Sequence, residues 1–153
     1  MRLIFSTPFV LPAKKAKEGD EQEKRNGKPY LDLGFEMTNA SNGIPRFSAG
    51  GIIRGKLKAE NCDMKKVKKA IIQLYGVEHS KWGQPRITSE NIKKEIKYDK
   101  DNKDNTITFE IQIPQNAKRS YNGKWSEYYW LLETKIDISG GSDIHANRII
   151  QVI

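Results

Sequence analysis

The sequence predicts an all-β protein of seven or eight strands, arranged as a sandwich or a barrel. Several segments alternate between apolar and polar residues with a period of two, which is typical of strands with one buried face. Gly, Pro, Asn and Asp separate these segments at short intervals. Asn122-Gly123 precedes a long aromatic segment and predicts a hairpin with a type I′ turn, in which both central residues have positive φ.

The composition indicates one soluble domain over residues 1–153, of which 30% are charged. The one cysteine, Cys62, has no partner for an internal disulfide and favours a reducing compartment. No apolar run reaches the length that spans a bilayer, and the first residues lack the long apolar region of a signal peptide. We therefore expect a cytoplasmic location.

The chain begins with a segment that suits the edge of a sheet, because Pro8 and Pro12 remove backbone donors from residues 5–12. Residues 13–28 are charged and lack large apolar side chains, which predicts a mobile loop. The segment 38–46, rich in Asn, Gly and Pro, is also predicted to be a loop. The strands are expected, in chain order, over 30–37, 47–59, 67–79, 91–98, 106–113, 126–138 and 144–152. The third of these also fits a helix face near its start, but its β-branched residues favour a strand.

The N-terminal edge is the first candidate for binding a partner. Its proline-bounded residues Phe9, Val10 and Leu11 keep backbone donors and acceptors that another strand can use. A protein partner could pair there by strand addition, and so could a second copy of this chain, which would give a homo-oligomer.

Trp82 is the second candidate, because it lies in a loop, 80–85, that is bounded by Gly and Pro. Two interpretations stay open: the indole plugs the end of the sandwich, or it anchors a partner.

A basic stretch supplies the alternative from another functional class. Residues 52–69 contain seven basic and two acidic residues, which gives this stretch a charge of +5. Its densest part is Lys65, Lys66, Lys68 and Lys69. Such a surface would bind nucleic acid or an acidic membrane through residues 54–69, although nucleic-acid binding also calls for neighbouring aromatic residues.

We find no pattern that predicts a catalytic, cofactor or metal site. Residues 50–57 approach the phosphate-binding loop pattern, but Leu57 stands where a magnesium-binding hydroxyl is needed. Cys62, His79 and His145 are too far apart in sequence to form a known zinc spacing.

Over nearly its full length the chain resembles an arrestin-type β-sandwich domain, which implies a two-sheet, immunoglobulin-like sandwich. It is similar to the N-terminal domain of arrestins, of the retromer's arrestin-like subunit and of the bacterial sporulation-control protein. The matching segments are 8–12, 51–57, 71–79, 109–114, 120–123, 129–137 and 143–150. The resemblance implies a non-catalytic scaffold or adaptor that binds other proteins. Family members usually carry two tandem sandwiches, whereas one fits here, and no residues correspond to the phosphate-sensing polar core of visual arrestins.

Overall fold

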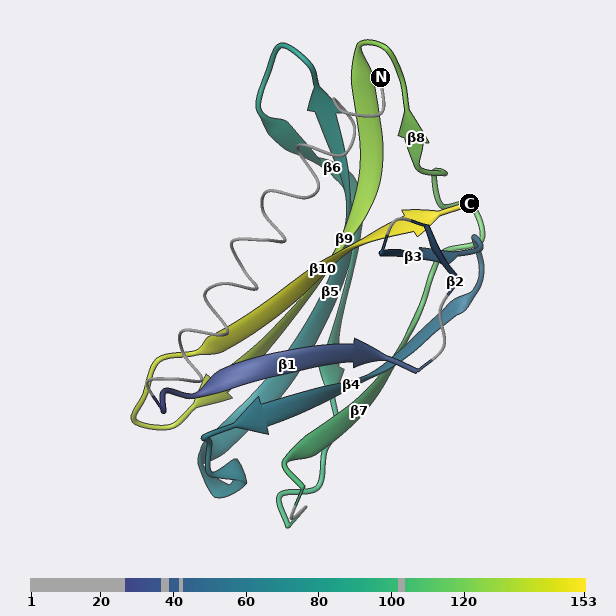
Figure 1. Ribbon diagram of the computed structural model, residues 1–153. Coiled ribbons are helices and arrows are strands. Elements are labelled where there is room, and N and C mark those ends of the chain that lie inside the picture. Colours follow the sequence, from purple (N-terminus) through teal and green to yellow (C-terminus); the bar gives the residue numbers. More distant parts are fainter. Residues whose placement is uncertain (1–26, 37–38, 42, 102–103) are drawn as a thin grey trace.

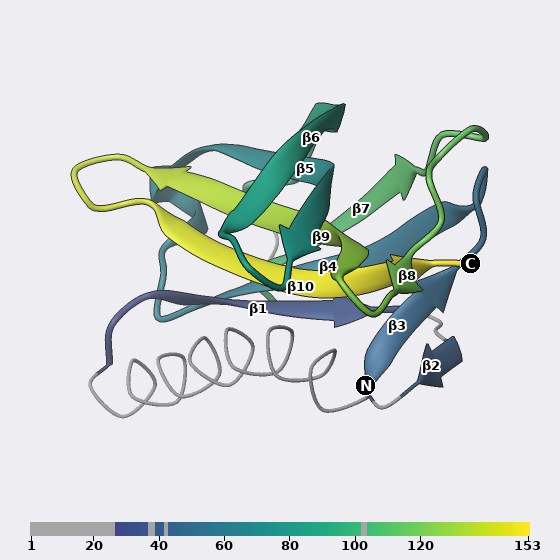
Figure 2. The same ribbon diagram turned by 90° about the horizontal axis from the view of Figure 1, so that it is seen from above.

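The computed structural model describes residues 27–36, 39–41, 43–101 and 104–153, which form two β-sheets (Figure 1). The smaller sheet is antiparallel, in the order β1 (Tyr30–Phe35), β4 (Ile52–Glu60) and β7 (Thr106–Gln112). The larger sheet has the order β2 (Asn39–Ser41), β3 (Ile44–Phe47), β10 (Ile144–Val152), β9 (Ser126–Ile138), β5 (Val67–Ser80) and β6 (Pro85–Ile96). The short β8 (Tyr121–Asn122) pairs with the start of β9, and only β3 and β10 are paired in parallel among the described strands. Figure 2 shows β6, β5, β9 and β10 following one another across the larger sheet.

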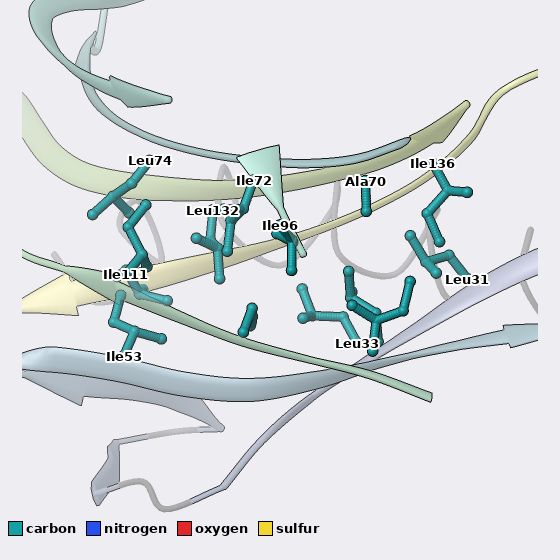
Figure 3. Packing of buried hydrophobic residues seen from close by; sticks show 14 of the residues in the cluster. Leu31, Leu33, Ile53, Ala70, Ile72, Leu74, Ile96, Ile111, Leu132 and Ile136 are labelled. Atoms are coloured by element: carbon teal, nitrogen blue, oxygen red, sulfur yellow. The ribbon is translucent and has the colours of Figure 1, made fainter. Parts of the chain in front are cut away.

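The alternation in the sequence places one face of each sheet in a shared core. In β4, for example, every second residue from Ile53 to Ala59 is buried, while Arg54, Lys56 and Lys58 face solvent. Figure 3 shows aliphatic side chains from both sheets meeting between the layers. The largest fully buried side chains are Trp130, Tyr128, Leu31, Ile53, Leu57, Ile72, Leu74, Ile107, Ile113, Leu132 and Ile136.

The predicted fold class is confirmed, and so are the long strands, although the one expected over 47–59 begins at Ile52, after a turn in which Gly51 N–H donates to the Ser48 carbonyl. The described residues contain ten strands, more than the seven or eight expected, because three short ones, β2, β3 and β8, are added. β2 and all of β3 except Phe47 lie in 38–46, so the prediction of a loop there was wrong. β6 begins at Pro85, six residues before the expected start, and the helical alternative near residue 67 reduces to the 3₁₀ turn η1 (Met64–Lys66). The described part of the chain contains no helix with the length and apolar character needed to cross a lipid bilayer.

The predicted type I′ turn at Asn122-Gly123 is wrong. Neither residue has a positive φ. Instead, Gly123 N–H donates to the Ser126 carbonyl over 2.8 Å, so the central residues of the turn are Lys124 and Trp125. Asn122 and Gly123 therefore belong to the strand side of the hairpin, and the turn at its tip presents an amine and an indole.

One flank of the sandwich lies between β6 and β7, the last strands of their sheets on this side within the described chain. Lys94 of β6 is the cross-strand partner of the buried Ile72, so its side chain extends toward the smaller sheet. Its ammonium donates to the Glu110 carbonyl of β7 over 3.0 Å. An open groove of about 440 Å³ runs along this flank.

Candidate functional site: an exposed pair of tryptophans

Two turns lie side by side at one end of the larger sheet (Figure 1). The first joins β5 to β6, where Gly83 N–H donates to the Ser80 carbonyl over 3.2 Å. The Ser80 hydroxyl also accepts a hydrogen bond from Trp82 N–H, as serine commonly does in turns. The second turn joins β8 to β9, and the two are linked by a hydrogen bond of 2.9 Å from Lys81 N–H to the Trp125 carbonyl.

This arrangement brings Trp82 and Trp125 together. Their ring centroids are 6.4 Å apart and the rings are inclined by 29°, so the indoles are stacked. Trp82 is nevertheless 76% exposed and Trp125 57% exposed. Ile87 and Tyr121 on the adjoining strands are exposed as well. The register places these two on opposite faces of the larger sheet, because Ile87 shares its face with Val77 and Tyr121 shares its face with Tyr128. The stacked pair of exposed indoles, in contrast, is a contiguous apolar feature, which marks an interaction site more often than a scatter of single apolar residues does.

Basic residues surround the indoles. The segments 81–86 and 118–125, which together we call the tryptophan end, contain five basic and no acidic residues. Lys81 lies 5.6 Å from the Trp82 ring centroid, and Lys124 lies 5.0 Å from that of Trp125. Arg86 forms a long ion pair of 3.8 Å with Glu78 of β5. Within the described chain, Lys81 and Lys124 form no ion pair, so their charges are available to a ligand.

The buried Tyr128 packs against β8, next to the second turn. Tyr128 is fully buried, stacks on Tyr121 with centroids 6.1 Å apart, and has the Lys118 ammonium 4.7 Å from its ring. Its hydroxyl lies 3.2 Å from the hydroxyl of Thr88. The ring fits only because residue 76 is glycine: a Cβ there would lie 1.9 Å from the tyrosine oxygen.

Trp130, the next large side chain on the same face of β9, fixes the approach to the second turn. Its indole N–H donates to the Lys118 carbonyl over 2.8 Å. The next residues are tied to the C-terminal strand, because Ser120 N–H donates to the Val152 carbonyl and its hydroxyl accepts from Val152 N–H. The tryptophan end therefore rests on rigid strands, as a preformed binding surface requires.

A polar pair crosses from β5 to β9 just beneath the two turns. His79 Nδ1 lies 2.9 Å from a carboxylate oxygen of Glu127, whose other oxygen is buried without a hydrogen-bond partner within the described chain. Burial raises the pKa of Glu127, and the bond to His79 partly opposes that rise. Among the described residues the imidazole bonds to no hydroxyl or thiol, so the pair has the geometry of a cross-strand link.

The other candidates are not brought together with the tryptophan end. Lys65 and Lys66 lie on η1, and Lys68 and Lys69 follow it, at the opposite end of the 14-residue strand β5. Further along the basic stretch, Arg54 is paired with Glu110 and Lys58 with Glu60 on the outer face of the smaller sheet. Phe9, Val10 and Leu11, like most of the predicted loop 13–28, lie outside the described residues. His145 lies on β10, and the described residues contain no cluster of three or more potential metal ligands.

Sequence reasoning found Trp82 but missed Trp125. The mistaken position of the turn placed Trp125 beside the following strand, and the two segments of the tryptophan end lie more than thirty residues apart. A signal was present, since each segment holds a Lys-Trp pair, Lys81-Trp82 and Lys124-Trp125. Only the pairing of β5 with β9, which opposes Ser80 to Ser126, brings these dipeptides together.

No protein-family model matches the chain, and no curated protein matches it. Among solved structures, the fold is similar to that of Spo0M, the sporulation control protein of Bacillus subtilis, with 15% sequence identity and a TM-score of 0.48. The match covers 81% of this chain and 49% of the other, so this chain spans about half the length of that structure. The likeness is to the same sporulation-control type that the sequence resembles, and it concerns the fold alone.

Proposed function

We propose that this protein is a non-catalytic interaction module that docks onto another macromolecule through the tryptophan end. The observation that carries the proposal is the stacked, solvent-exposed pair Trp82 and Trp125. Exposing two indoles to water is unfavourable, whereas burying them in an interface is among the largest contributions that a side chain makes to binding.

The surroundings of the pair also favour binding over catalysis. The indoles lie on two tight turns that are hydrogen-bonded to each other, so little conformational entropy is lost when a partner covers them. The described side chains near the indoles are mainly basic and aromatic. The histidine–carboxylate pair His79 and Glu127 lies close by, but no hydroxyl or thiol is hydrogen-bonded to the imidazole within the described chain, as a nucleophile would be.

The proposed docking surface differs from the N-terminal strand edge and from the basic stretch 54–69. Both of those remain proposals for further contacts, by strand addition or by attraction to a polyanion. The tryptophan end is preferred because it combines exposed apolar area, fixed geometry and basic residues that form few ion pairs.

Site-specific photo-crosslinking in living cells tests the proposal even when the identity of the partner is unknown. A photoreactive phenylalanine analogue replaces Gln84, which is exposed beside Trp82, or Gln112, an exposed residue of β7 that serves as the matched control. We expect adducts from position 84 and not from 112. The adducts should fall at least about tenfold when Trp82 and Trp125 are both changed to Ser in the same chain. Equal adducts at both positions, or adducts that do not depend on the two tryptophans, would refute docking at this end.

A further inference from the structure

We infer that the partner of the tryptophan end is the surface of an anionic phospholipid bilayer. This inference rests on the proposed function and identifies its ligand. Tryptophan is enriched where proteins meet the bilayer interface, because its ring is apolar and its N–H is polar. Lysine and arginine beside such an anchor attract anionic headgroups.

The charge of the tryptophan end supports this choice. Its five basic residues, Lys81, Arg86, Lys118, Arg119 and Lys124, come from two separate segments with no acidic residue between them in either segment. The nearest carboxylate of β9, Glu127, is buried against His79 and does not reach the surface. Among the described residues, the one partly exposed carboxylate beside it, Glu78 of β5, is paired with Arg86. The other four basic residues leave this end with an excess of positive charge, which complements an anionic leaflet.

The shape of the tryptophan end favours a deformable ligand. Trp82 and Trp125 protrude from the tips of neighbouring turns. A folded protein would need a pocket shaped for both indoles, whereas the headgroup region of a bilayer adapts to any apolar tip of this size. Lys81 and Lys124 can then remain at the level of the phosphates while the rings enter beneath them, since long cationic side chains extend toward the polar layer.

The ring geometry disfavours the competing nucleic-acid interpretation. Binding of single strands depends on free aromatic faces on which bases stack. Here the two indoles stack on each other, and a lysine ammonium lies over each ring. The faces that the two indoles turn toward each other are closed to a base, whereas insertion into lipid uses the exposed remainder of both rings.

The test uses the full chain with two kinds of vesicle: neutral phosphatidylcholine, and phosphatidylcholine with about one third phosphatidylglycerol. Co-sedimentation measures partitioning at low and high salt. We expect binding to the anionic vesicles only, weakened by salt because the charges are screened. Bromine-labelled lipids should quench the emission of Trp82 and Trp125 in the bound state.

Matched variants separate this surface from general positive charge. Changing Lys81 and Lys124 to Gln should weaken partitioning about 25-fold, at about fivefold for each charge near the leaflet. Changing Lys65 and Lys66 to Gln removes the same charge at the opposite end of β5, roughly 45 Å away, and should leave partitioning within about twofold. Changing both tryptophans to Ser should weaken it at least about tenfold. Circular dichroism confirms that each variant is folded, and the lysine variants keep the test valid if the tryptophan variant is not.

Three results would overturn the inference. Equal losses in the two lysine variants would indicate non-specific attraction. Tryptophan-dependent binding of a single-stranded oligonucleotide, with no binding to vesicles, would assign the surface to nucleic acid. Absence of vesicle binding together with photo-crosslinking of position 84 to a protein would refute the membrane while leaving the proposed docking function intact.

Discussion

Replacing Gly76 by Ala should destabilise the domain through a single steric conflict beneath the tryptophan end. The added Cβ would lie 1.9 Å from the Tyr128 hydroxyl oxygen, 2.7 Å from the carbon that bears it and 2.8 Å from the Thr88 hydroxyl. Non-bonded carbon and oxygen atoms do not approach this closely, so the tyrosine has to move by more than about 1 Å.

Tyr128 has little room for such a movement. It is fully buried. Its ring centroid lies 6.1 Å from that of Trp130, which is edge-on to it, and 6.1 Å from that of Tyr121, which is stacked on it. Overpacking of a filled core costs about 2 kcal/mol, and disturbing the hydroxyl contact to Thr88 adds about 1 kcal/mol. A loss of about 3 kcal/mol in the free energy of unfolding corresponds to a melting temperature lower by about 6–12 °C for a domain of this size.

Gly34→Ala is the matched control for this experiment. Gly34 also lies in a strand, its φ is not positive, and a Cβ there would meet no atom within 4 Å. We expect no loss of stability, and a gain of up to about 1 kcal/mol from reduced freedom of the unfolded chain. Thermal unfolding followed by circular dichroism measures both variants. Equal melting temperatures for the two would show that Gly76 does not confine the Tyr128 ring, and the steric explanation would be wrong.

Three further changes address the two turns and their supports. Gly123→Val should destabilise the hairpin by about 1–3 kcal/mol, because a Cβ would lie 2.9 Å from the Ser126 carbonyl oxygen; an unchanged urea midpoint would contradict this. Burial raises the pKa of Glu127 above its usual 4.5, so the folded state holds this proton more tightly than the unfolded chain, and wild-type stability should fall as the pH rises from about 4.5 through the raised pKa. Glu127→Gln should remove that part of the pH dependence in urea titrations, whereas an identical profile would assign it to other groups. Trp130→Phe should cost about 2–4 kcal/mol, because it leaves a cavity and a carbonyl without its donor, and chemical denaturation that shows less than about 1 kcal/mol would argue against both effects.

The long strands were predictable because burial of one face imposes a strict two-residue period. β4 shows this directly, since its alternating sequence becomes alternating exposure without exception from Ile52 to Ala59. This signal lies within one segment and does not depend on which strands lie beside it.

Features that depend on distant partners escaped prediction. β3 contains Pro45 and follows Gly43, so its local residues favour a loop, yet pairing with β10 holds its far end in the larger sheet. The predicted position of the second turn rested on a strong local signal, Asn122-Gly123. In the structure, two cross-strand pairs between β8 and β9 place the turn at Lys124-Trp125 instead. The candidate site depended on that same register, and for this reason sequence reasoning recovered only one of its two indoles.

Lys94, which extends across the flank between β6 and β7, affects how the protein self-associates at high concentration. Edge strands offer unpaired backbone groups to which further chains can add, and long, flat edges lead to fibrils. If another strand closed this flank, the Lys94 ammonium would lose water and gain no counter-ion from the backbone that covers it. Each added strand would therefore incur a desolvation cost at the first step of growth. We expect this one inward-pointing charge to keep the molecule from polymerising through its own sheet edge, and Lys94→Val to be the change that exposes it to amyloid-like assembly.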